Sequence, residues 1–321
     1  MPLINQSSYS HPFYLFNGHI QTIVPSIFRT VEGVTYTRQR LELPDGDFLD
    51  IDWLNNDAQR LVIISHGLEG SSHRHYVKGM ANYFFDRGWS ALAWNCRGCS
   101  GEMNRLPKFY HHGATEDLKA VVDHAIEKGY NQIALVGISM GGSMTLKYFG
   151  EHGAQLPYPV KCAAVFSVPC HLGDSARELD KPHQKFYLNR FLKKLSKKIE
   201  KKSILFPNII SHTGFKHIQS FREFDNRYTA PLHGFQNADD FYERASSGPY
   251  IEKIQRPVLI VNALNDPFLP VTCFPFQVAR THPLVWLETP RAGGHVGFSL
   301  KGKKENWMEL RAFEFTQQYI P

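Results

Sequence analysis

The sequence has no run of roughly 18 or more apolar residues, so no segment is long enough to cross a bilayer as a helix. Its first 19 residues show no basic start, no apolar core and no small-residue cleavage site, and we expect no leader peptide. Cysteine is scarce: the chain has five, an odd number. These features predict a reduced, cytoplasmic protein without a transmembrane segment.

Two of the cysteines, Cys96 and Cys99, form a C-x-x-C pair, a pattern found in redox pairs and in half of a zinc site. No second cysteine pair follows, and the residues between them lie in a loop after an expected strand. We therefore expect no metal site and no redox role for these thiols.

The composition is that of a globular protein: 42% of the 321 residues are hydrophobic and 13% are aromatic. Residues 34–43 and 48–54 predict two antiparallel strands joined by a Pro-Asp-Gly-Asp turn. Further buried strands are expected at residues 61–65, 90–95, 132–138, 161–168, 257–264 and 284–287. Helices are expected at residues 75–87, 115–128 with Thr115 as N-cap, 140–152, 272–280 and 305–318. This alternation predicts an α/β fold, a mostly parallel central sheet with helices on both faces.

Between residues 170 and 248 the alternation is lost, and we expect a helical cap inserted into a single domain that spans residues 1–321. Within it, residues 185–202 predict one amphipathic helix with eight basic residues and one acid. Its apolar stripe is formed by Leu188, Phe191, Leu192, Leu195 and Ile199. The helix is either a lid or interfacial element that attracts an acidic substrate or associates weakly with an anionic membrane surface, or it packs on the core with its lysines in water, which is the commoner case. No stacking array or known motif accompanies the lysines, so nucleic-acid binding is not expected.

The stretch GISMGG, residues 137–142, has the pattern G-x-S-x-G. An apolar strand precedes it and a helix follows it, which is the context of a nucleophile elbow. Glycine on both sides lets the chain bend tightly around Ser139. A serine hydroxyl also needs a base, a group that orients the base, and donors for the oxyanion.

The base and its carboxylate are expected after the late strands. His295 follows residues 284–287 behind two glycines, and Asp266 follows the apolar run 257–264. Ser, Asp and His in this chain order are typical of α/β-hydrolases. The expected oxyanion donors are the backbone N–H groups of Met140 and of Leu68, which lies in the loop SHGLEG after an earlier strand.

Other polar residues near these motifs have plainer interpretations. His66 is expected to shape the oxyanion loop, and Glu69 either touches substrate or lies in solvent. His111 and His112 are expected to be structural or to line the pocket, and Asp117 is expected to belong to a first helical turn. Asp239 and Asp240 lie in the insertion and are weaker candidates than Asp266 for the acid.

Together, GISMGG, SHGLEGSS, NCRGCSGE, NALNDPFLP and AGGHVGF resemble the motifs of the α/β-hydrolase superfamily, and more narrowly of its YheT-like branch of esterases. The phrases NGHIQTIVP at residues 17–25 and DDFYERASS at residues 239–247 are similar to those of the same branch. The resemblance covers nearly the whole chain and implies a triad of Ser139, Asp266 and His295.

The sequence thus predicts a serine hydrolase that cleaves small-molecule or lipid carboxylic esters and requires no metal or organic cofactor. A phospholipase, a thioesterase or an acyltransferase on the same fold remains an alternative. A binding protein that keeps the pocket without useful turnover is a further one.

Overall fold

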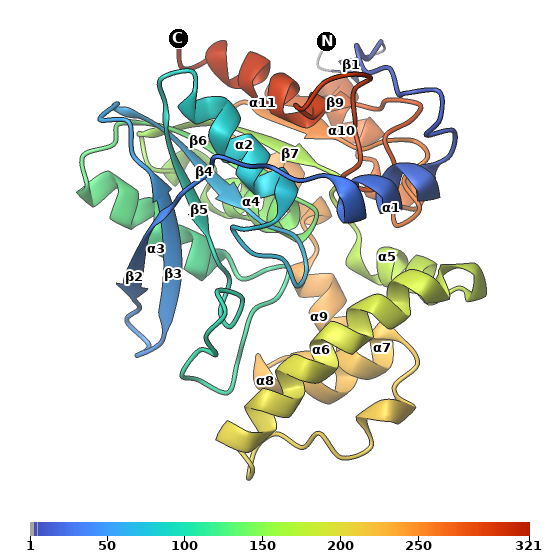
Figure 1. Ribbon diagram of the computed structural model, residues 1–321. Coiled ribbons are helices and arrows are strands. Elements are labelled where there is room, and N and C mark those ends of the chain that lie inside the picture. Colours follow the sequence, from blue (N-terminus) through green and yellow to red (C-terminus); the bar gives the residue numbers. More distant parts are fainter. Residues whose placement is uncertain (1–2, 5) are drawn as a thin grey trace.

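The computed structural model describes residues 3–4 and 6–321 (Figure 1). Met1, Pro2 and Asn5 belong to the stretch examined above for a leader peptide, and they lie outside the described residues. No helix within the described residues is both long enough and apolar enough to cross a membrane.

A single sheet forms the centre of the molecule. Within the described residues it has nine strands, in the order β1-β9-β8-β7-β6-β4-β5-β3-β2. Their bounds are β1 Leu3–Ile4, β2 Thr37–Glu42, β3 Phe48–Leu54, β4 Arg60–Ser65, β5 Ser90–Trp94, β6 Gln132–Ile138, β7 Val160–Phe166, β8 Val258–Val261 and β9 Val285–Glu288. All neighbouring pairs are parallel except β2 with β3 and β3 with β5. The predicted fold class, with an antiparallel pair opening a mostly parallel sheet, is confirmed.

Helices cover both faces of this sheet (Figure 1). On one face, α2 and α11 pack against a cluster that contains Val62, Ile64 and Val136. On the other face, α3, α4 and α10 pack against Leu61, Ile63 and other side chains of alternate strand positions. The bounds are α2 His75–Phe85, α3 Thr115–Glu127, α4 Met140–His152, α10 Phe276–Thr281 and α11 Trp307–Gln317. Because the central strands β4 to β8 are covered on both sides, their sequences are largely apolar rather than alternating.

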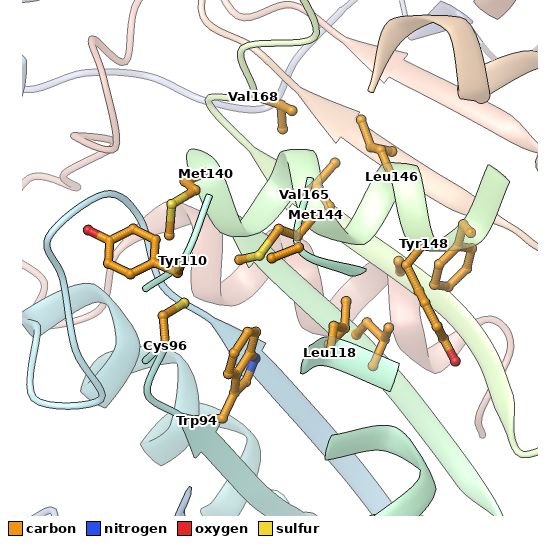
Figure 2. Packing of buried hydrophobic residues seen from close by; sticks show 14 of the residues in the cluster. Trp94, Cys96, Tyr110, Leu118, Met140, Met144, Leu146, Tyr148, Val165 and Val168 are labelled. Carbon is orange, nitrogen blue, oxygen red and sulfur yellow. The ribbon is translucent and has the colours of Figure 1, made fainter. Parts of the chain in front are cut away.

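The first turns of α4 are part of this core. Met140 and Met144 extend from α4 into a cluster with Trp94, Cys96 and Tyr110 (Figure 2). Met140 and Met144 are both fully buried. The residue that follows Ser139 is therefore anchored in the core, so the start of α4 has a fixed position relative to the sheet.

Between β7 and β8 the chain forms helices α5 to α9, which lie together beyond one edge of the sheet and away from both termini (Figure 1). Their bounds are α5 Leu172–Leu179, α6 Lys185–Leu205, α7 Phe221–Phe224, α8 Ala230–Leu232 and α9 Ala238–Ala245. The predicted apolar stripe of α6 packs inward, with Leu188, Leu192, Leu195 and Ile199 buried. Residues 225–229 between α7 and α8 form a π-helical turn.

Two local expectations are wrong, and two elements were not expected. Thr115 is not the N-cap of α3: Ala114 precedes the helix, and the Thr115 hydroxyl instead donates to Glu151. The helix expected at residues 272–280 is interrupted at Pro275 into a short 3₁₀ turn and α10, because proline lacks the N–H that a continuous helix needs. Strand β1 and helix α1 Gly18–Phe28 were not expected at all.

Candidate active site

Ser139 lies at the turn between β6 and α4 with φ +55° and ψ −116°, a conformation that non-glycine residues rarely adopt. The two flanking glycines make this turn possible. A Cβ atom on Gly137 would lie 2.5 Å from the carbonyl oxygen of Gly141, and one on Gly141 would lie 2.2 Å from that of Ser65. The serine is therefore held on a rigid, strained turn at the end of a central strand, as the motif requires.

His295 and Asp266 meet Ser139 at this turn. The Nε2 atom of His295 lies 3.0 Å from Oγ of Ser139, and its Nδ1 atom lies 2.9 Å from Oδ2 and 3.1 Å from Oδ1 of Asp266. Oδ1 of Asp266 also accepts a hydrogen bond from the Phe268 N–H, which fixes the carboxylate. The Phe268 ring packs against the imidazole with 4.2 Å between ring centroids. The three predicted side chains, from loops far apart in the sequence, thus form one continuous hydrogen-bonded chain.

The loop that carries His295 is held by α1. The His295 N–H donates to Oγ1 of Thr22, 2.8 Å away. Buried Gln21 accepts from the N–H of Gly293 at 2.7 Å and from the side chain of Asn265 at 2.9 Å, and it donates to the Leu15 carbonyl. Gln21 therefore connects the histidine loop to the loop of the carboxylate. Neither α1 residue was expected at the site, although both lie in the phrase at residues 17–25.

The two expected oxyanion donors are not used by other protein groups. Within the described residues, neither the Leu68 N–H nor the Met140 N–H has a protein acceptor. Leu68 is in the Gly67–Gly70 turn beside Ser139, and Met140 is the first residue of α4. An unpaired N–H at a helix start is a good donor to a developing negative charge.

The turn that contains Leu68 is held by a buried cluster of Glu69, Tyr110 and Lys198. Glu69, at φ +50°, accepts a hydrogen bond from the Tyr110 hydroxyl and pairs with Lys198 of α6, whose Nζ is 2.8 Å from its carboxylate. The expectation that Glu69 touches substrate or lies in solvent is therefore incomplete. Lysines 198 and 202 of α6 are buried, so the expectation that the lysines of this helix all lie in water is also wrong.

Several alternative residues have structural roles. Buried His66 lies between the Gly67 carbonyl and the Cys96 N–H, and burial lowers its pKa to about 4. His111 and His112 line a pocket, and Asp117 pairs with buried Arg97. Asp239 and Asp240 form surface pairs with arginines and do not line either pocket at Ser139.

Two pockets meet at Ser139. The first runs under helices α5, α6, α7 and α9 and is lined mostly by apolar side chains, including Leu172, Leu195, Phe221, Phe224 and Phe241. The second lies between α1, the start of α2 and α6. Both are also lined by His295, Leu68, Phe191 and Phe268. The segment 170–248 therefore supplies walls to both pockets.

No site for a metal ion is evident in the described part of the chain, since no three histidine, cysteine or acidic side chains lie close enough together to hold one. All five cysteines are free thiols. Burial raises the pKa of Cys99 to about 11, which disfavours the reactive thiolate.

The comparisons with known proteins agree with this fold. A family model described as the α/β hydrolase fold matches residues 60–272, and the chain belongs to that family. It is 35% identical to YheT of Escherichia coli strain K12, a candidate esterase, over 95% of this chain and 91% of that protein, which confirms the predicted YheT-like branch.

Two further proteins illustrate the range of the relatives. Phospholipase ABHD3 of Homo sapiens is 28% identical over 99% of this chain and 80% of that protein. Among solved structures, the Pyrococcus furiosus esterase Pf2001 is similar with a TM-score of 0.59, covering 91% of this chain and 96% of that one. At 19% identity this second likeness concerns the fold alone. The names of these relatives are those of ester-cleaving hydrolases.

Proposed function

We propose that this protein is a serine hydrolase that cleaves carboxylic esters through an acyl-enzyme at Ser139. The observation that carries the proposal is the position of His295, whose two ring nitrogens lie 3.0 Å from the Ser139 hydroxyl and 2.9 Å from the Asp266 carboxylate. This geometry suits a base that takes the serine proton while a carboxylate stabilises the resulting imidazolium.

In the proposed reaction, Oγ of Ser139 bonds to the ester carbonyl carbon as its proton passes to Nε2 of His295. The carbonyl oxygen becomes an oxyanion and accepts hydrogen bonds from the Leu68 and Met140 N–H groups, each worth roughly 3 kcal/mol in the transition state. The tetrahedral intermediate then expels the alcohol, which takes the proton from His295. A water molecule, deprotonated by the same imidazole, hydrolyses the acyl-enzyme and releases the acid.

The apolar first pocket supports a substrate with a hydrocarbon acyl chain. Apart from Ser139 and His295, its walls are mainly aliphatic and aromatic side chains from α5, α6, α7 and α9. Burying an acyl chain stabilises the complex by about 0.8 kcal/mol per methylene group. A lipid ester is therefore a suitable substrate class, and the relative named as a phospholipase is consistent with it.

The test is to replace Ser139 with alanine and measure hydrolysis of p-nitrophenyl butyrate. The expected loss in kcat is roughly 10⁶-fold, because triad residues act as a unit. A fluorophosphonate probe should label the wild-type protein and neither Ser139→Ala nor His295→Ala. Ordinary turnover by Ser139→Ala would contradict the proposal. Labelling without ester turnover, but with cleavage of acyl-CoA or acyl transfer, would favour the thioesterase or acyltransferase alternative.

We also propose weak contact between α6 and an anionic membrane surface. Lys197 and Lys201 are exposed on one side of α6, and the exposed apolar side chains Ile204, Leu205 and Ile209 follow at its end. Basic and apolar groups side by side favour the surface of an anionic bilayer. Co-sedimentation with phosphatidylserine vesicles should exceed that with phosphatidylcholine vesicles, and a Lys197→Glu/Lys201→Glu variant should lose the difference; equal binding in all cases would contradict it.

A further inference from the structure

The two pockets at Ser139 differ in charge. Of the residues described as lining the first pocket, none is a lysine or an arginine. The second pocket is lined by Arg74, Arg190 and Lys194. Because an ester extends in two directions from its carbonyl carbon, a nucleophile between two pockets can place the acyl chain in one and the alcohol in the other. The apolar pocket suits the acyl chain, which leaves the cationic pocket for the alcohol.

The three cations of the second pocket have no carboxylate partner. Arg74, Arg190 and Lys194 are half-buried, and none lies within 4.0 Å of an acidic side chain in the described part of the chain. Glu69 is the acid that lines this pocket, and it is already paired with Lys198. Lys194 donates instead to the backbone carbonyl of Glu69 at 3.2 Å. The positive charge at this place is therefore not neutralised by the protein.

The cations are also close enough to repel one another. Burial and then the charge of Arg74 lower the pKa of Lys194; the Glu69 carboxylate opposes this shift, and Arg190 adds a smaller lowering effect, so the pKa stays below its usual value. Such crowding costs free energy in the empty pocket, and a bound anion would relieve it. His75 adds no charge, because burial and then the charges of Arg29 and Arg74 lower its pKa to about 3.

The start of α2 contributes a second feature that favours anions. The helix begins at His75 with no side-chain cap, and its first turn has no acidic residue. Its first two residues, His75 and Tyr76, line the second pocket. The N–H groups of Val77 and Lys78 already bond to the Arg74 carbonyl, so the start of this helix offers a phosphate its partial positive charge and the N–H groups of His75 and Tyr76.

We infer that the second pocket binds an anionic group on the alcohol part of the ester, and that a phosphate held by Arg74, Arg190 and Lys194 is the group it fits. This inference rests on the proposed function, since it assigns the alcohol side of the same site. The substrate class is then an acyl ester of a phosphate-bearing alcohol. The phosphate determines which alcohol is accepted, while Ser139, His295 and Asp266 carry out the reaction.

The test compares two esters that differ only in the phosphate: 1-butyrylglycerol and 1-butyrylglycerol 3-phosphate. A short acyl chain keeps both esters in solution and separates recognition of a phosphate group from binding to a lipid surface. For the wild-type protein, kcat/KM should be about tenfold higher for the phosphate ester, because charge-assisted contacts to phosphate are strong. The preference should shrink as salt is added.

Substitutions locate the site. Arg74→Gln and Arg190→Gln should each lower the ratio of the two kcat/KM values several-fold, since each removes one charge and keeps a polar side chain. Arg190→Glu should reverse the preference. The matched control is Lys193→Gln, the same charge change on an exposed residue of α6 that lines neither pocket. Because the readout is a ratio within one protein, partial misfolding does not imitate it.

Binding of glycerol 3-phosphate, measured by calorimetry, tests the pocket without turnover. The wild-type protein should bind it, and Arg190→Gln should bind it about tenfold more weakly. A wild-type ratio of one or less, or a ratio that Arg74→Gln and Arg190→Gln leave unchanged, overturns the inference while ester hydrolysis at Ser139 stands. Conversely, tight binding of glycerol 3-phosphate by a protein that cleaves no ester would refute the proposed function and leave an anion site.

Discussion

Lys198 lies outside the proposed triad, yet its replacement by methionine should slow ester hydrolysis. The residue is 5% exposed, and its Nζ lies 2.8 Å from the Glu69 carboxylate and 3.1 Å from Sγ of Cys99. Burial opposes its charge, but Cys99 and Glu69 outweigh that effect and raise the pKa of Lys198. Methionine has a similar length and is apolar, so the variant removes the charge while keeping much of the packing.

The magnitude follows from two effects. Removing one partner of a buried ion pair costs about 3–5 kcal/mol, because the other charge is left unpaired. Part of that cost should appear locally, since Glu69 has φ +50° and is the neighbour of Leu68 in the turn beside Ser139. If the turn relaxes and the Leu68 N–H leaves its position, about 3 kcal/mol of transition-state stabilisation is lost, equivalent to roughly 10²-fold in kcat.

The assay measures kcat and KM for p-nitrophenyl butyrate together with the thermal midpoint Tm. We expect Lys198→Met to lower kcat by about 10- to 100-fold with a much smaller change in KM. The control is Lys202→Met, one turn further along α6. Lys202 is also buried, but it donates to the carbonyls of Asn104, Leu106 and Lys108, away from the Gly67–Gly70 turn, which is the proposed oxyanion turn. The Lys202→Met substitution should lower Tm and leave kcat nearly unchanged.

A double variant separates charge from packing. Lys198→Met/Glu69→Gln removes both charges and keeps an oxygen at residue 69 that the Tyr110 hydroxyl can donate to. It should recover much of the Tm lost in the single variant, because neutralising both partners of a buried pair costs far less than neutralising one. Should Lys198→Met lower Tm as Lys202→Met does and yet retain full kcat, the reasoning about the oxyanion turn would be refuted.

Two further predictions concern groups that the proposed triad does not include. Gln21→Leu should lower kcat about tenfold and reduce the free energy of unfolding by about 1–3 kcal/mol. The reason is that the N–H of Gly293 and the Leu15 carbonyl lose their hydrogen-bond partner. Unchanged kinetics with a correctly folded variant would contradict the assigned role of α1. Burial raises the pKa of Asp225, in the first pocket, to about 7. The folded state therefore holds a proton between about pH 4 and pH 7 that the unfolded state has released, and stability falls as pH rises through that window. Asp225→Asn removes this dependence, so its Tm relative to wild type should rise from pH 5 to pH 8, and a constant difference would exclude the mechanism.

The positions of Ser139, Asp266 and His295 could be predicted because each follows a buried apolar strand. Runs such as 132–138 and 257–264 define strands directly, and parallel strands place their carboxyl ends at one edge of a sheet. Three polar residues that follow such strands are therefore brought together by topology. Their observed separations of about 3 Å agree with that expectation, and the catalytic role itself remains a proposal.

Helix α1 could not be predicted in the same way. It begins at Gly18 and contains Pro25, two residues that weaken any helical pattern. Its formation depends on tertiary contacts that local sequence does not reveal: Gly18 packs so closely on Asn265 that a Cβ atom would lie 2.0 Å from that residue's carbonyl oxygen. Consequently the roles of Gln21 and Thr22, which hold the histidine loop, could not be predicted from local sequence. The one indication was that the phrase around them is similar to one in the YheT-like branch.

The lysines of α6 show why a charge pattern predicts a helix better than it predicts the surroundings of each residue. The apolar stripe was correct, but the rule that a run of lysines faces water failed at Lys198 and Lys202. Both are buried because the partners lie far away in sequence: Glu69 in the oxyanion turn, and three carbonyls of the loop 104–108. A single helix, α6, therefore contacts the proposed oxyanion turn through the ion pair between Lys198 and Glu69. Through Arg190 and Lys194 it also forms a wall of the cationic second pocket. Side chains of α6 line both pockets and contact Glu69, the neighbour of Leu68, so α6 is one route by which the segment 170–248 can act on catalysis.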